Sequence, residues 1–296
     1  MTFTQCKTDP CIFVLGQSDS ALLVTLYVDD LIIGSRCEKS TSKFADTLSK
    51  HFKLKRLGNV RFVLGTEVNY NQVERRLSVC QQASISRMIE KYNQVKAKDI
   101  DSPCVQGQFL TKIKAIDSRM VNRPYRSLVG SLLYIANGTR PDISFAVGQL
   151  SWHLKNPNEK HWNAAIRVLR YLKTTISREI CFGVAKGQIK LSSFCDTDWA
   201  SNKDNRKLTS GFMVMFDSSS VIFKSKLQQS VALSTAEAEY IALSICGQEI
   251  LWLRNILMEI GICALEKTVV YEDNQSAIAI ALNNKYQSHA KHIHMK

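Results

Sequence analysis

Three acidic residues in the last third of the chain have the chemistry and the spacing of a metal site. Asp196 and Asp273 lie in two strand-like runs, and Glu237 lies in the first turn of the helix expected between them, Ser234 to Ile260. If the strands pack beneath that helix, the three carboxylates converge. Such a cluster can hold two divalent metal ions about 4 Å apart, which activate a water and stabilise the leaving oxygen when a phosphodiester is cut.

Glu237 also has a purely structural interpretation. Ser234 followed three residues later by Glu237 forms a capping box, in which both side chains satisfy free amides at the helix start. Nearby acidic residues are second choices, because strand alternation points Glu272 away from Asp273 and helix geometry rotates Glu239 by about 200° from Glu237. The remaining second choices are Asp198 and Asp204.

A second pair of carboxylates lies near the start of the chain. Asp29 and Asp30 split the most apolar stretch, residues 21–34, and the flanking apolar residues predict a hairpin with its corner at the two acids. A structural turn would favour Asn-Gly or Asp-Gly, and adjacent carboxylates repel each other. A divalent metal that also binds a nucleotide's phosphates would offset that repulsion, so the pair indicates a metal site on a rigid hairpin.

Alternating helical and strand-like patterns surround these acids. Residues 125–137, 142–154 and 161–174 predict three helices, separated at Pro141 and Pro157. From Ser177 onward, four strand-like runs precede the helix that begins at Ser234, and a fifth run and a second helix follow it. This order predicts an α/β layer in which helices pack against a mixed five-stranded sheet.

Several of these motifs resemble those of copia-type LTR retrotransposon Pol polyproteins. Tyr-Val-Asp-Asp at residues 27–30 resembles the Tyr-x-Asp-Asp motif of reverse transcriptases, and its flanks resemble the polymerase palm. The runs SSFCDTDWA, STAEAEYIAL and YEDNQSAIA resemble the ribonuclease H domain of the same family. The resemblance implies an α/β and α+β architecture with a partial palm over residues 1–100, a helical thumb and connection over 101–176, and a ribonuclease H-like domain over 177–296.

The resemblance also implies roles for the acids. Asp196, Glu237 and Asp273 match the family's acidic positions, with Asp196 bridging two Mg²⁺ or Mn²⁺ ions, and His294 stands where family members often have a fourth acid. The family's third polymerase Asp and its nucleotide-gripping fingers lie upstream of a segment like the one that begins this chain. The chain is therefore expected to be a Pol fragment truncated at both ends, with the Asp-Asp pair a polymerase remnant.

Charge points to nucleic acid as the partner. The formal net charge of +13 and the pI near 9.3 indicate a polyanionic partner and favour nucleic acid over a membrane. We expect this partner to be an RNA–DNA hybrid or the backbone of DNA or RNA. Arg167, Arg170 and Lys173 recur every three residues and would form a basic edge for phosphates, although a solvated helix face fits equally well. Residues 62–68 resemble the family's primer-gripping turn, with an ordinary half-buried strand as the alternative.

Cysteine usage and hydropathy indicate in which cellular compartment the protein is expected. Nine Cys without C-x-x-C pairs predict reduced thiols, and neither a signal peptide nor an apolar run long enough for a membrane span is evident. We therefore expect an intracellular, unsecreted protein, and the resemblance implies cytoplasmic virus-like particles or the nucleus, with the rest of Pol as a further partner.

Three functions fit these observations. The leading hypothesis is a metal-dependent nuclease that cuts the RNA strand of RNA–DNA hybrids. The alternative is a non-catalytic nucleic-acid-binding remnant of a retrotransposon polyprotein. A working polymerase would require a partner polypeptide that supplies the missing front half.

Overall fold

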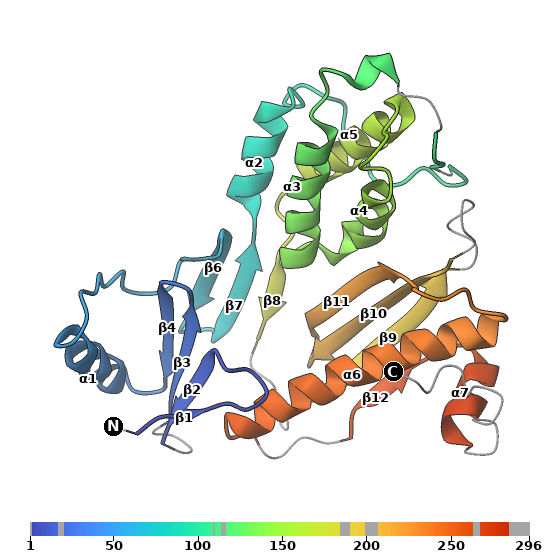
Figure 1. The fold of residues 1–296 in the computed structure, drawn as a ribbon. Helices are drawn as coiled ribbons and strands as arrows, with labels where there is room; N and C mark the ends of the chain where they lie inside the picture. The colour runs from blue at the N-terminus through green and yellow to red at the C-terminus, as the bar shows by residue number, and fades with distance from the viewer. Residues whose placement is uncertain are drawn as a thin grey trace.

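The structure is a computed structural model, and it describes residues 2–16, 21–108, 110–113, 117–183, 190–198, 207–262 and 267–283. Within these ranges the chain forms three four-stranded sheets and a group of helices (Figure 1). The mixed α/β character matches the sequence expectation. His294 and Asp204 lie outside the described residues.

The first sheet is antiparallel throughout and runs β1 (Thr4–Gln5), β2 (Ile12–Leu15), β3 (Leu22–Tyr27), β4 (Asp30–Ser35), followed by helix α1 (Glu38–Ser49). Tyr27 pairs directly with Asp30, so the corner consists of Val28 and Asp29, one residue earlier than the sequence predicts. Val28 has φ of 51°, because a two-residue hairpin needs a left-handed turn position to match the strand twist. Asp30 is therefore a strand residue.

The second sheet joins segments far apart in sequence. Its order is β5 (Phe62–Val63), β6 (Thr66–Asn71), β7 (Arg76–Cys80), β8 (Ile180–Phe182), all antiparallel. The turn between β5 and β6 has positive φ at both Leu64 and Gly65, as a type I′ turn requires. Residues 62–68 thus form a hairpin rather than one strand.

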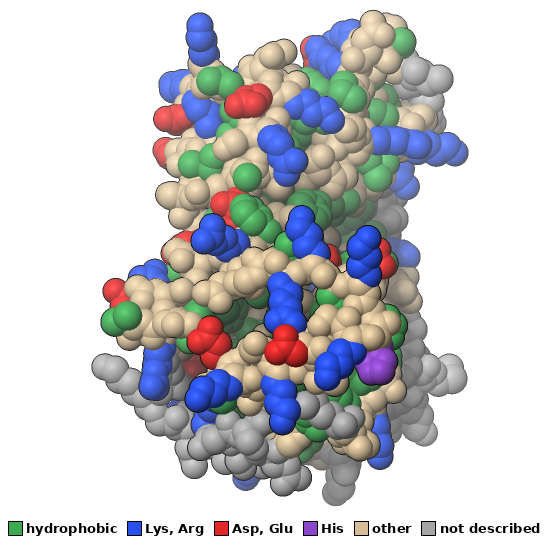
Figure 2. Space-filling model, turned by 90° about the vertical axis from the view of Figure 1, so that its left-hand side faces the viewer, with side chains coloured by type: hydrophobic (Ala, Val, Ile, Leu, Met, Phe, Trp, Pro, Cys, Tyr) green, Lys and Arg blue, Asp and Glu red, His purple; other side chains and the backbone are tan. Residues whose placement is uncertain are grey.

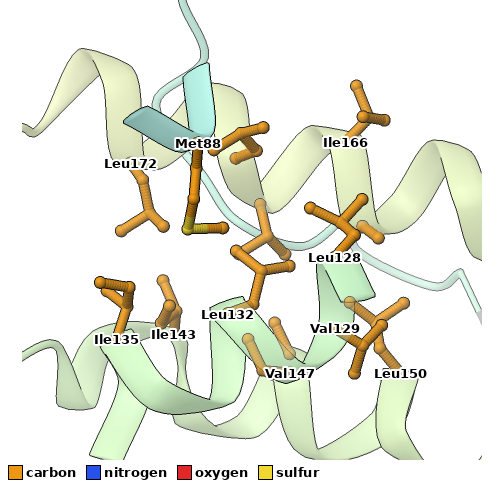
Figure 3. Close-up of a cluster of buried hydrophobic side chains, with 14 of the residues drawn as sticks. Met88, Leu128, Val129, Leu132, Ile135, Ile143, Val147, Leu150, Ile166 and Leu172 are labelled. Atoms are coloured by element: carbon orange, nitrogen blue, oxygen red, sulfur yellow. The ribbon is translucent and has the colours of Figure 1, made fainter. Parts of the chain in front are cut away.

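Four helices pack against one another around a hydrophobic core, and one of them, α4, also contacts strand β11 (Ser219–Leu227) of the third sheet. They are α2 (Gln82–Lys91), α3 (Tyr125–Gly138), α4 (Ser144–Ser151) and α5 (Glu159–Thr174), with 3-10 turns η2 (Ser118–Met120) and η3 (Pro141–Ile143). The last three helices agree with the sequence prediction. Figure 3 shows their apolar side chains pointing toward one another, and Leu128, Val129, Leu132 and Ile135 of α3 are fully buried.

The third sheet has the order β11-β10-β9-β12, from β9 (Leu191–Asp198), β10 (Thr209–Phe216), β11 (Ser219–Leu227) and β12 (Val269–Tyr271). Strand β12 is parallel to β9, and the other pairs are antiparallel. The sequence predicts five strands here, but β8, the first of them, pairs with β7 in the second sheet. Helix α5 packs against α2, which directly follows β7, so the chain that leaves α5 runs along the open edge of β7.

Helix α6 (Thr235–Glu259) lies along one face of the third sheet, and α7 (Gln275–Leu282) packs against it (Figure 1). The spacing of Ile241, Ile245, Trp252 and Ile256 predicts that they share one buried face of this helix. Ile256 is buried, whereas Trp252 is 42% exposed. Small side chains at Ala238, Ala242 and Cys246 are buried instead, because they let the helix lie close to the strands. By length and composition alone α6 could also cross a membrane, because an 18-residue stretch of it has a mean hydropathy of 1.2, whereas the sequence predicts no such apolar run.

Candidate functional site

An acidic cluster forms where β9, β12 and α6 meet. One carboxylate oxygen each from Asp196, Glu239 and Asp273 lies within 4.8 Å of the other two. Asp196 is in β9, and Asp273 follows β12 by two residues. Because β12 runs parallel to β9 with Tyr271 beside Phe194, two further residues along each strand bring the two aspartates together.

The helix contributes Glu239 to this cluster, and not Glu237. The Glu237 carboxylate accepts a hydrogen bond from the Leu233 amide at 2.7 Å, and the Glu237 amide donates to the Ser234 hydroxyl at 3.2 Å. Ser234 and Glu237 therefore both satisfy amides at the helix start, as the structural interpretation of Glu237 expects, although the Glu237 carboxylate binds the amide before the N-cap residue Ser234. Two residues further along, the helix has turned by about 200°, which places Glu239 between α6 and the sheet, only 8% exposed.

Burial makes Glu239 the unusual member of the cluster. Desolvation, then the negative charge of Glu272, and then those of Asp196 and Asp273 raise the pKa of Glu239 to about 7, although the Thr197 hydroxyl opposes the rise. Its Oε2 atom is buried without a hydrogen-bond partner in the described part of the chain. A buried carboxylate oxygen without a donor, next to two exposed aspartates, is a suitable site for a hard divalent cation.

Glu272 faces the opposite side of the strand from Asp273, as strand alternation predicts. Its carboxylate accepts hydrogen bonds from the Cys195 thiol at 3.1 Å and from the Asn274 amide at 3.1 Å. Cys195 in turn packs with Cys246 in the small core under α6. Glu272 is therefore not one of the three grouped acids, and it affects the cluster because its negative charge raises the pKa of Glu239.

A pair of aromatic rings lies next to the acids. Phe194 and Tyr271 stack with ring centroids 4.8 Å apart and an interplanar angle of 16°, and each ring is about half exposed. Each precedes one of the aspartates, Asp196 or Asp273, by two residues, so all four side chains lie on the same face of paired strands. This aromatic pair was not predicted from the sequence, although the equal spacing from each Asp was a usable signal.

The hairpin acids are not part of a comparable cluster. Asp29 and Asp30 are both exposed, one in the turn and the other at the start of β4. In the portion of the chain that the structure describes, no third histidine, cysteine or carboxylate joins them within ligand distance. The geometry gives two carboxylates at this position.

The predicted basic edge on α5 contacts protein. The Arg167 guanidinium donates to the Ser102 carbonyl at 3.1 Å, and that of Arg170 donates to the Gln94 side chain at 2.8 Å. Lys173 donates to the Ala97 carbonyl at 2.6 Å and pairs with a neighbouring aspartate. These three side chains hold residues 94–102 against α5 and are only partly exposed.

Comparisons with known proteins match this chain to reverse transcriptases and to retrovirus-related Pol polyproteins. The family described as "Reverse transcriptase (RNA-dependent DNA polymerase)" matches residues 1–106. The chain is 37% identical over its full length to the retrovirus-related Pol polyprotein from transposon TNT 1-94 of Nicotiana tabacum, and 32% identical over 98% of its length to that from transposon RE2 of Arabidopsis thaliana. It spans 22% and 20% of these two polyproteins, about a fifth of each.

A shorter relative matches most of this chain over most of its own length. The putative transposon Ty5-1 protein YCL074W of Saccharomyces cerevisiae is 30% identical over 81% of this chain and 77% of its own length. No solved structure was found to match.

Proposed function

Since the chain belongs to the retrovirus-related Pol polyproteins of copia-type transposons, we propose that it is a ribonuclease H-type endonuclease, which hydrolyses the RNA strand of RNA–DNA hybrids. The observation that supports this proposal is the cluster of Asp196, Glu239 and Asp273. It supplies oxygen ligands from two strands and one helix, and rigid elements of this kind can keep metal ligands in place.

The donor set fits Mg²⁺ or Mn²⁺. Carboxylate oxygens are the ligands that these hard cations prefer, and the partnerless Glu239 oxygen would otherwise stay buried without compensation. When bound, a pair of such ions supplies an activated water and stabilises the oxygen that leaves the phosphodiester. Asp196 and Asp273 would hold the ions on the exposed side of the cluster, and Glu239 would hold them from the buried side.

Glu239 would also link metal binding to pH. With a pKa of about 7 it carries a proton in much of the metal-free protein near neutrality. A cation that binds at the cluster must displace this proton, because only the ionised carboxylate is a good ligand. Near neutral pH, a bound cation would therefore raise the fraction of the protein in which all three acids are ionised.

The remaining surface suits a polyanionic substrate. Figure 2 shows Lys and Arg side chains spread over the face on which α1 lies, with fewer Asp and Glu side chains among them. The net charge of +13 favours contacts to the phosphate backbone, which carry no sequence preference. We include the stacked Phe194 and Tyr271 in the substrate surface, since half-exposed aromatic rings can contact bases or sugars beside the scissile phosphate.

A second candidate function is nucleic-acid binding without catalysis. The incomplete carboxylate set at Asp29 and Asp30 favours it for the polymerase part, because two acids alone supply too few ligands for a two-metal site. Under this alternative the acidic cluster would also have no catalytic activity. The two functions therefore differ in one measurable result, hydrolysis of a hybrid.

Cleavage of a labelled RNA–DNA hybrid in Mg²⁺ or Mn²⁺ tests the proposal. Asp196→Asn and Asp273→Asn should abolish cleavage while hybrid binding persists, because the amides keep the side-chain volume and lose the charge that metals need. Tyr240→Phe, one residue from Glu239, is a control outside the acidic cluster. Cleavage by the two Asn variants at the parent rate would rule out the acidic cluster as the active site.

A further inference from the structure

The first turn of helix α6 is tied to the third sheet through one backbone carbonyl, that of Ala238. The Gln228 side-chain amide donates a hydrogen bond to this carbonyl at 2.9 Å, and the Thr197 hydroxyl donates to it at 3.2 Å. Ala238 directly precedes Glu239 in the chain. Two side chains from the sheet side of the helix therefore hold the backbone next to the buried carboxylate of the acidic cluster.

Gln228 joins the end of the sheet to the helix. It directly follows β11 and is only 4% exposed. Its Nε2 atom donates to the Ser210 hydroxyl of β10 at 2.8 Å as well as to the Ala238 carbonyl. A carbonyl can only accept hydrogen bonds, so the amide nitrogen of Gln228, and not its oxygen, must face the helix. Both protons of that nitrogen are thus used.

The other end of the same amide is unsatisfied. Within the described ranges, the Oε1 atom of Gln228 is buried without a hydrogen-bond partner. A buried acceptor without a donor destabilises the fold, and an apolar side chain of similar size would avoid this cost. Space filling alone therefore does not account for a glutamine at this position, whereas its two donated hydrogen bonds do.

Thr197 contacts both the helix and one of the aspartates. It lies in β9 directly after Asp196 and opposite Ser210 of β10. Its backbone amide donates to the Asp196 carboxylate at 2.8 Å, while its side chain donates to the Ala238 carbonyl. One residue thus links the position of the strand acid to that of the helix.

Charge repulsion within the cluster gives these hydrogen bonds a function. Glu239 lies within 4.8 Å of the carboxylates of Asp196 and Asp273, and like charges at this distance push the helix away from the sheet when no cation is bound. A rotation of the helix would also replace Glu239 with Glu237 on the side of the aspartates. Neutral hydrogen bonds to the Ala238 carbonyl oppose both movements and add no charge to the site.

We propose that Gln228 and Thr197 are positioning residues for Glu239, which hold the first turn of α6 so that this carboxylate faces Asp196 and Asp273. Neither side chain is a metal ligand in this arrangement, because both act through the Ala238 backbone. The inference rests on the proposed function for the role of the cation and deepens it, since metal binding then depends on two side chains outside the acidic cluster.

Calorimetric titration of Mn²⁺ tests the two positions, with urea unfolding to check that each variant is folded. Gln228→Met removes both donors at similar volume, and Thr197→Val removes the hydroxyl in the same way. Each should weaken Mn²⁺ binding about tenfold or more, as removal of groups that orient metal ligands does elsewhere. Parent-like Mn²⁺ affinity in Gln228→Met or in Thr197→Val would overturn the assignment for that residue.

Two matched controls accompany these variants. Gln229→Met changes the neighbouring glutamine, which is exposed, and Thr197→Ser keeps the hydroxyl. Both should bind Mn²⁺ like the parent. Equal losses in Thr197→Ser and Thr197→Val, or in Gln229→Met and Gln228→Met, would overturn the inference, because the donated hydrogen bonds would then not be the cause.

A double variant tests whether Gln228 acts through Glu239. If it does, adding Gln228→Met to Glu239→Gln should weaken Mn²⁺ binding no further than Glu239→Gln alone. A second loss as large as the one that Gln228→Met causes in the parent would show that Gln228 acts on another part of the site, and the positioning role would be refuted.

Hydrogen exchange in the metal-free protein separates this inference from the proposed function. Amides of residues 235–242 should exchange faster in Gln228→Met and Thr197→Val than in the parent, while those of residues 250–257, near the other end of α6, keep the parent rates. If the parent binds no Mn²⁺ and cleaves no hybrid but these rates rise, the positioning of α6 stands and the hydrolase proposal fails. Parent rates at residues 235–242 in both variants would refute the positioning alone.

Discussion

Replacing Glu239 with Gln should stabilise the metal-free protein at alkaline pH. The folded protein holds a proton on Glu239 with a pKa of about 7, against an ordinary value of 4.5 in the unfolded chain. At a pH below 4.5 the carboxyl is protonated in both the folded and the unfolded state and does not affect the free energy of unfolding. As pH rises to the higher value the folded state loses stability relative to the unfolded chain, and above it the loss is constant.

The size of this loss follows from the two pKa values. The gap between 4.5 and about 7, at 1.36 kcal/mol per pKa unit, gives about 3 kcal/mol. Little solvent screening reduces it, since Glu239 is only 8% exposed. Gln has no charge to desolvate at any pH. The Glu239→Gln variant should therefore match the parent near pH 4 and exceed it by about 2 to 3 kcal/mol near pH 8.

Urea unfolding in EDTA across this pH range measures the difference. Glu237→Gln is the matched control, because that carboxylate lies at the start of the helix and the Gln side-chain oxygen can still accept the hydrogen bond from the Leu233 amide. Its curve should follow the parent at every pH. A constant gap between parent and Glu239→Gln from acid to alkaline pH would refute the argument, since only a titrating group gives a pH-dependent gap.

Other predictions concern the helical core, the β5–β6 turn and the hairpin acids. Leu132→Ala should cost about 2 to 5 kcal/mol in urea unfolding because Leu132 is fully buried, while Leu251→Ala, 63% exposed, should cost less than about 0.5 kcal/mol. Gly65→Ala should cost about 1 kcal/mol more than Gly107→Ala, since both have φ of +74° but only at Gly65 would a Cβ overlap the Tyr134 hydroxyl. Equal losses would contradict this. The isolated chain should not extend a primer on an RNA template, and template-dependent nucleotide incorporation would disprove that expectation.

The sequence located the aspartates of the site better than its glutamate. Asp196 and Asp273 could be predicted because strand ends and their order are local patterns. Choosing between Glu237 and Glu239 required the rotation of α6 about its own axis. That rotation is set by which small residues, such as Ala238 and Ala242, pack on the sheet, and it brings Glu239 rather than Glu237 to the two aspartates.

Which segments contact one another was harder to predict than the helices and strands themselves. The pattern at residues 180–182 correctly indicated a strand, but its pairing with β7 depends on the packing of α5 against α2. The spacing of Arg167, Arg170 and Lys173 correctly indicated one helix face. Their contacts lie in residues 94–102, a segment without periodicity that gives no signal of where it packs.

Calorimetric titration of Mn²⁺ into the parent, Glu239→Gln and Glu237→Gln tests whether Asp196, Glu239 and Asp273 together bind divalent metal ions. The parent and Glu237→Gln should bind Mn²⁺ alike and release a proton near neutral pH, whereas Glu239→Gln should bind much more weakly and release none. Loss of Mn²⁺ binding in Glu237→Gln with retention in Glu239→Gln would show that Glu239 is not a ligand.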